Sequence, residues 1–152
     1  MQVCRTAAAV TLLVACGALF AGPAAVDAAS PAQRSMVGKV NAVRAAHGLK
    51  ALRPVAPLHR SARRYAAWML RRDYFGHLGR IRASSRFSLL GENLAWHSGR
   101  RPRVGWTVRA WLGSPGHRAL LLHPRFRWLG AGLARGTMGA RRATAWVLHF
   151  GG

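Results

Sequence analysis

The chain has 152 residues and a formal net charge of +21 at neutral pH, from 24 lysines and arginines against three acidic residues. Such a charge attracts polyanions of any kind, including nucleic acid, anionic lipid and wall polymers, without identifying one of them. The 51% hydrophobic composition and the six tryptophans exclude a disordered basic tail and predict a packed globule. Arginine supplies 22 of the 24 cations, which suits phosphate recognition but follows equally from a GC-rich genome.

Residues 1–28 have the pattern of an export signal. An apolar run covers residues 7–21, and Val26-Asp27-Ala28 forms a small-residue cleavage site. The run is roughly 15 residues long, against the ~20 that a membrane span needs. We therefore expect a secreted, extracellular protein without a membrane span in its mature form. Leu13-Val14-Ala15-Cys16 supports an alternative, a lipoprotein anchored through Cys16.

Residues 29–152 are predicted to form a single domain. Their number lies within the usual size range of one domain with a modest core. Both cysteines, Cys4 and Cys16, precede this part of the chain. No disulfide is therefore expected to hold the mature domain together.

Four helices are predicted. Ser30 and Gln33 form a capping box around Pro31 and start a helix over 31–47. A second helix begins after Pro57, with arginines mostly off its apolar face. A third covers 104–112, and Ser114-Pro115 opens a short fourth helix with His117 in its first turn.

Three strands are predicted, and a long irregular segment precedes most of them. Residues 77–103 lack sustained periodicity apart from a short strand within 89–97, and loops of such length are often functional. The end of the chain predicts two strands, 126–134 and 143–150, joined through 136–139. Helices followed by a hairpin predict an α+β layered domain.

Three segments each place a polar side chain in an apolar or turn-forming context. They end or centre on His77, Glu92 and His117, and Glu92 is the only glutamate of the chain. We expect a specific partner for it, either a histidine or an arginine such as Arg86. Two imidazoles and a carboxylate could hold a divalent cation such as zinc with an open position for water. Their separations of 15 and 25 residues match no local ligand spacing, so a hydrogen-bonded structural cluster is the alternative.

The order of these segments resembles the CAP superfamily, or SCP domains, which includes cysteine-rich secretory proteins, antigen 5 and the plant pathogenesis-related class 1 proteins. The resemblance covers nearly all of 34–151 and is closest to the short bacterial branch without disulfides. The matching segments are 41–44, 48–49, 52, 58, 74–77, 86, 91–95, 111–118, 126–132 and 146–150.

The resemblance implies a three-layer α-β-α sandwich with a small antiparallel sheet and a cleft that holds two histidines and two glutamates. Some members bind a divalent metal there. By motif, His77 is like the first histidine, Glu92 like the first glutamate and His117 like the second histidine. Ser114 stands where the second glutamate is expected. This loss weakens cation affinity and paired-acid catalysis, and Ser114 is expected to cap the helix that positions His117.

Other residues near these motifs have simpler interpretations. His149 is expected in the core or sheet, and Asn93 is expected to satisfy a buried backbone group. Tyr74 and Phe75 are expected to form the floor of the cleft. His97 is the one further histidine that could reach it.

The sequence favours a secreted binding or interaction module over an enzyme. Its cleft of His77, Glu92, His117 and Ser114 would take a small ligand or a divalent cation. One alternative is a metal-assisted hydrolase. The other is a cationic protein that binds an anionic component of the cell envelope or a membrane through its arginines. Nucleic acid is not expected as a partner, because the chain is exported and has no recognition motif.

The cleft also leads to an expectation about pH. An ionised Glu92 beside His77 and His117 would favour a protonated imidazole in the folded protein. Without a metal, the cleft would then stabilise the fold more below neutral pH than above it.

Overall fold

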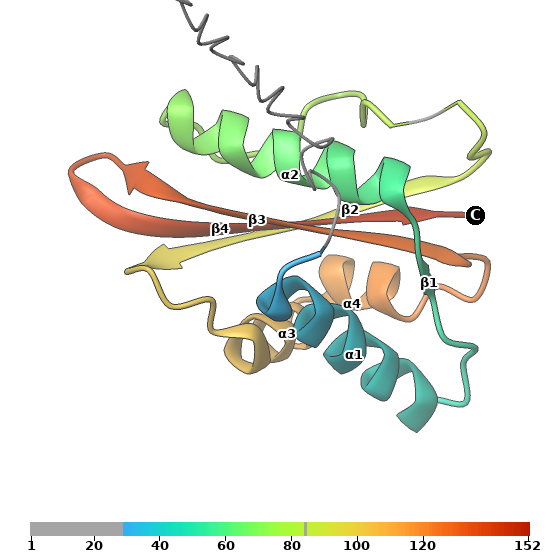
Figure 1. The fold of residues 1–152 in the computed structure, drawn as a ribbon. Coiled ribbons are helices and arrows are strands. Elements are labelled where there is room, and N and C mark those ends of the chain that lie inside the picture. The colour runs from blue at the N-terminus through green and yellow to red at the C-terminus, as the bar shows by residue number, and fades with distance from the viewer. Residues whose placement is uncertain (1–28, 84) are drawn as a thin grey trace, which may run out of the picture.

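The computed structural model describes residues 29–83 and 85–152 as three layers (Figure 1). Helix α2 (Ala56–Arg71) covers one face of a four-stranded sheet, and α1 (Pro31–Ala46), α3 (Val104–Leu112) and α4 (Pro115–Leu121) cover the other. The predicted α+β sandwich is confirmed. The predictions for residues 1–28, including the cleavage site and Cys16, lie outside the described residues.

Helix α1 begins as its capping box predicts. The backbone N–H of Gln33 donates to Ser30 Oγ at 3.3 Å, and the N–H of Ser30 donates to Gln33 Oε1 at 2.8 Å. These two bonds satisfy donors that have no partner within the helix. The helix ends before Gly48, whose φ of +68° is a conformation that glycine adopts without strain.

The sheet has the order β1-β3-β4-β2. Strands β2 (Leu90–Ser98), β3 (Trp128–Met138) and β4 (Arg141–Gly151) pair antiparallel, while the two-residue β1 (Arg53–Pro54) pairs parallel with β3. The sequence analysis did not predict β1, because a strand of two residues is too short to show alternating apolar and polar side chains. Strands β3 and β4 extend beyond their predicted ends, since Met138 pairs with Arg141 across a turn at Gly139 rather than at 136–139.

Two hydrophobic clusters fill the spaces on either side of the sheet. The cluster on the side of α1, α3 and α4 includes Met36, Trp111 and Trp146, and the cluster under α2 includes Ala62, Met69 and Val147. Strand β4 is central and is buried from Ala143 to its end. Strand β2 lies at an edge, so segments from both helical layers can meet beside it.

Arg44 fixes α4 relative to the end of α1. Its side chain is fully buried, and it donates to the carbonyl oxygens of Leu121 at 2.8 Å, His123 at 3.1 Å and Lys50 at 2.9 Å. Burial lowers the pKa of the guanidinium below its ordinary value. The carbonyls of Leu121 and His123 lie at the C-terminal end of α4 and just beyond it, where a positive charge is favourable. Arg44 thereby helps to hold the helix that carries His117.

The helices of the described residues can be compared with the requirements for a membrane span. Across the described part of the chain, no helix combines the length and the apolar character needed to cross a membrane.

Candidate functional site

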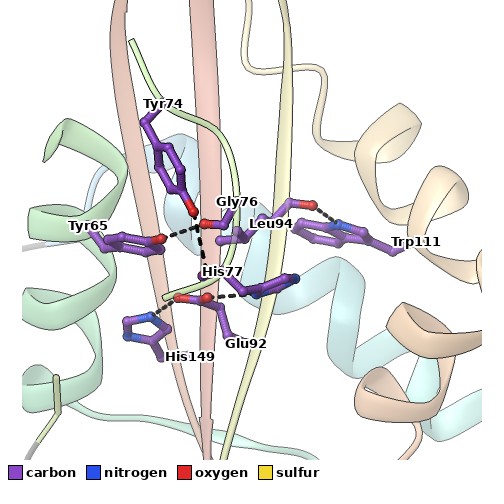
Figure 2. A network of polar contacts seen from close by, with 8 residues as sticks. All are labelled: Tyr65, Tyr74, Gly76, His77, Glu92, Leu94, Trp111 and His149. Atoms are coloured by element: carbon purple, nitrogen blue, oxygen red, sulfur yellow. Dashed lines mark hydrogen bonds and ion pairs between the residues drawn. The ribbon is translucent and has the colours of Figure 1, made fainter. Parts of the chain in front are cut away.

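Glu92 lies at the centre of a buried polar network (Figure 2). Its side chain is 6% exposed, and its direct cross-strand partner on β4 is His149. Glu92 Oε2 lies 2.8 Å from His149 Nε2, and Glu92 Oε1 lies 2.8 Å from His77 Nδ1. The only glutamate of the chain therefore has two histidine partners, one of them predicted from its motif. Arg86, the alternative partner, lies over the ring of Phe87 at 4.8 Å.

Ser61 of α2 extends this network on the far side of His149. Ser61 Oγ lies 2.7 Å from His149 Nδ1 and donates to the carbonyl oxygen of Leu58 at 3.1 Å. The hydrogen bonds thus run from Ser61 through His149 and Glu92 to His77. The prediction that His149 is buried in the sheet is confirmed, since it is 2% exposed, but its contact with Glu92 was not predicted.

The loop that carries His77 is held by two tyrosines. The hydroxyl of Tyr65 on α2 donates to the carbonyl oxygen of Gly76, and the hydroxyl of Tyr74 donates to that of His77 at 3.3 Å. Burial raises the pKa of Tyr65 to about 12, and the charge of Glu92 and Tyr74 contribute further. Tyr65 therefore stays a neutral donor that fixes the loop at neutral pH.

The prediction that Tyr74 and Phe75 form the floor of the cleft is wrong. Tyr74 is 37% exposed and Phe75 is 43% exposed. Tyr74 packs edge-on against Trp68, with ring centroids 5.5 Å apart and an interplanar angle of 69°. Neither ring lines the cavity described below, whose aromatic wall comes from Tyr65 and Trp68 of α2.

His117 lies beside this network but not within it. Ser114 occupies the N-cap position of α4, yet its hydroxyl makes no capping bond and lies 2.9 Å from His117 Nδ1. The predicted cap is therefore absent because the imidazole engages the serine hydroxyl. Burial lowers the pKa of His117, and the charge of His77 lowers it further. His77 thus acts on His117 through space, while the contacts of Glu92 go to His77 and His149.

Asn93 behaves as predicted, and His97 does not reach the site. Asn93 Nδ2 donates to the carbonyl oxygen of His117 at 3.1 Å, which ties α4 to β2. His97 lies near the other end of β2, where its ring packs edge-on against Trp106 at 6.0 Å. Alternation along a strand places Asn93 and His97 on the face opposite Glu92.

The pH dependence of stability tests whether His117 bonds Ser114, as observed, or Glu92, as expected. Its folded pKa is below the unfolded value of about 6.5. The folded state therefore binds fewer protons than the unfolded state as pH falls. The contribution to stability is complete above about pH 6.5 and is lost as pH falls through that value toward the folded pKa. This direction is opposite to the sequence-based expectation for His117, because burial and the charge of His77 lower its pKa while Glu92 contacts other imidazoles.

We expect His117→Gln to lose less stability than the wild type between pH 8 and pH 5.5. Urea unfolding at the two pH values measures the difference. His47→Gln is the control, since His47 is an exposed histidine at the end of α1. Equal losses in the wild type and His117→Gln would show that the His117 imidazole is not the group responsible.

The arrangement does not fit a resident metal ion. In residues 29–83 and 85–152, no three His, Cys, Asp or Glu side chains are grouped so that they could hold one. Both oxygens of Glu92 accept hydrogen bonds from imidazoles, and Nδ1 of His117 is bonded to Ser114. The motif residues His77, Glu92 and His117 converge on one region without forming a ligand set.

A cavity of about 500 Å³ lies between α2 and the segment 78–82. Glu92, His149 and Ser61 form its polar end, so it opens directly on the buried network. Its apolar lining comes from Tyr65, Trp68, Leu78 and Ile81, and its charged lining from Arg64, Arg71, Arg80 and Arg82. On α2, residues 61, 64, 65, 68 and 71 follow helical spacing along one face. That spacing is the sequence signal that could have identified Ser61 and this wall.

Comparison with known proteins decides the family. The family model of the CAP, or cysteine-rich secretory protein, family matches residues 37–150. The chain belongs to the CAP family. The CAP domain here shares 31% identity over 117 residues with the uncharacterized protein YkwD of Bacillus subtilis, covering 71% of this chain and 44% of YkwD. The chain spans 44% and 32% of the two curated relatives it matches, less than half of each.

Solved structures share the CAP fold at lower identity. An extracellular SCP-domain protein of Bacillus anthracis superimposes with a TM-score of 0.62 and 23% identity, covering 79% of this chain and 40% of that one. NaASP2, crystallised with Zn²⁺, superimposes with a TM-score of 0.65 and 14% identity, covering 86% and 84%. The CAP family therefore includes extracellular proteins, and the three-layer fold of this chain is that of the family.

Proposed function

We propose that this CAP-domain protein is an exported binding module whose site is the cavity between α2 and 78–82. A small organic ligand would bind there against the polar end formed by Glu92 and His149. The observation that carries this proposal is that the cavity opens on the buried carboxylate and imidazole. Its volume lies within the range of about 300–1,000 Å³ of small-molecule sites, which are mostly apolar with a few placed polar groups. Export is supported by the pattern of residues 1–28 and by the extracellular relative.

The motif residues contribute to this site in different ways. Glu92 would present a fixed acceptor, held in place by His149 and His77. His77 is not part of the cavity lining; its side chain is 57% exposed and contacts Glu92 from the neighbouring loop. His117 and Ser114 lie outside this lining, on α4 across the sheet, where the pair is bonded internally.

The network supports catalysis less than binding. Ser61, His149 and Glu92 are connected like a nucleophile, a base and an acid. Acyl transfer, however, also needs N–H donors aimed at the developing oxyanion. Ser61 lies in the interior of α2, where the backbone N–H groups are used within the helix. Its hydroxyl also donates to Leu58.

A divalent cation is supported less than an organic ligand. The similarity to NaASP2, crystallised with Zn²⁺, favours a cation. The carboxylate that would bind it already accepts two hydrogen bonds, and Ser114 replaces the second acidic residue of the motif. A cation would have to displace His77 or His149 from Glu92 before coordination could begin.

Fluorescence of the neutral probe N-phenylnaphthylamine tests the binding site. We expect saturable binding at one site, and we expect Trp68→Ala to weaken it about tenfold through loss of one aromatic wall. Trp106→Ala is the matched control, because Trp106 is an exposed tryptophan on α3 across the sheet. The proposal fails if the probe does not saturate, or if both tryptophan variants bind it equally.

A further inference from the structure

The cavity between α2 and 78–82 has a charged lining as well as an apolar one, and the motif residues do not account for it. We propose that its ligand is an organic anion, with an apolar body that packs in the cavity and an acidic group that binds the arginines. This inference rests on the proposed function and names the chemical class of the ligand.

The four lining arginines approach from two walls. Arg64 and Arg71 come from α2, on either side of Trp68, and Arg80 and Arg82 come from the facing segment. All four residues are exposed. Within the part of the chain that the structure describes, their side chains engage in no hydrogen bond or ion pair. Their guanidinium groups are therefore available to an anion from outside, and a planar fork suits carboxylate, sulfonate or phosphate oxygens.

The cavity supplies little negative charge of its own. Glu92 is the one acidic residue among those that line it, and each of its oxygens contacts an imidazole. The other acidic residue in the described range, Asp73, accepts a hydrogen bond from the backbone N–H of Gly139. Four cations and one carboxylate leave a net positive lining, which favours an anionic ligand over a neutral or cationic one.

The apolar lining argues against a small inorganic anion as the preferred ligand. Tyr65, Trp68, Leu78 and Ile81 cover the walls between the arginines. Leu78 is 41% exposed, so an apolar ligand body would remove its surface from water. Burial of apolar area adds affinity that phosphate or sulfate alone cannot gain. An anion with an apolar body therefore uses both parts of the lining.

Two probes that share a ring system separate charge from shape. Anilinonaphthalene sulfonate carries an acidic group, and N-phenylnaphthylamine lacks it. We expect the double variant Arg64→Gln with Arg80→Gln, one arginine from each wall, to weaken the sulfonate probe about tenfold. Binding of the neutral probe should change by less than about twofold, since the apolar walls are intact. Circular dichroism verifies that the exposed substitutions leave the fold unchanged.

The control removes the same charge from the other side of the sheet. Lys39→Gln with Arg109→Gln changes two exposed cations on α1 and α3, and we expect less than about twofold weakening of either probe. Equal weakening in the two double variants would overturn the inference, because the general field of the protein would then attract the sulfonate. Equal affinity of both probes for the wild type would also overturn the inference of an anionic ligand. The proposed function as a binding module would not be affected by that result. If neither probe saturates, both proposals fail.

Discussion

Gly132→Ala is expected to destabilise the fold by about 3 kcal/mol or more. Strand β3 lies so close to α2 that a Cβ at Gly132 would be 2.2 Å from the carbonyl carbon of Ala62. The neighbouring atoms belong to the helix backbone, which cannot move away as a flexible side chain can. A Cβ at Gly130 would meet the carbonyl carbon of Leu58 at 2.0 Å, so the contact is repeated one helical turn away.

Gly136→Ala provides the control on the same strand. A Cβ at Gly136 would lie 3.4 Å from side-chain atoms of Leu70, which can adjust by a few tenths of an ångström. We expect a loss of about 1 kcal/mol or less. Urea unfolding of the three proteins measures the difference. Similar losses for Gly132→Ala and Gly136→Ala would show that the close approach of α2 does not contribute to stability in this way.

The same close approach positions the polar network. Leu58 and Ala62 precede and follow Ser61 on α2, and Ser61 is the residue that contacts His149. Gly130 is also the cross-strand partner of His149. The two glycines thus set the distance between α2 and the sheet at the point where the hydroxyl meets the imidazole. A helix displaced by an added methyl group would lengthen that contact and widen the cavity.

Local sequence signals predicted the parts of the site that depend on local structure. The capping box and the end of α1 before Gly48 are set by neighbouring residues, and the resemblance to the CAP family placed His77 and Glu92 together. His149 needed more. Alternation along β4 predicted its burial, but its contact with Glu92 depends on the register between β2 and β4, which join segments 57 residues apart.

His117 and Ser61 show two other reasons why the sequence did not predict the contacts of the site. The motif order placed His117 in the cleft, but the hydroxyl of Ser114 lies three residues away and engages the ring first. A chain with glutamate at position 114 would offer the His117 ring a carboxylate instead of a hydroxyl. Ser61 is hidden in a helix whose apolar and arginine-rich faces dominate the pattern. Helical spacing could place Ser61 on the cavity face, but its contact with His149 depends on how α2 packs on β4.

Glu92→Ala is expected to lower the free energy of unfolding by about 3 kcal/mol at pH 7. The substitution leaves Nε2 of His149 without its acceptor in a side chain that is 2% exposed, and it also opens a small void. Glu92→Gln keeps the volume and one acceptor oxygen, so we expect a smaller loss of about 1–2 kcal/mol. Urea unfolding measures both.

Asp73→Asn is the control for the loss of a carboxylate, because Asp73 is the exposed acidic residue of the described domain and asparagine tolerates its φ of 48°. We expect a change of about 1 kcal/mol or less. If Glu92→Ala is no more destabilising than Asp73→Asn, the buried network does not stabilise the fold. Glu92 also forms the polar end of the cavity. A folded Glu92→Gln protein therefore tests whether Glu92 contributes to ligand binding as well as to stability. Unchanged binding of the neutral probe N-phenylnaphthylamine in that variant would assign Glu92 to stability, and weakened binding would assign it to the ligand as well.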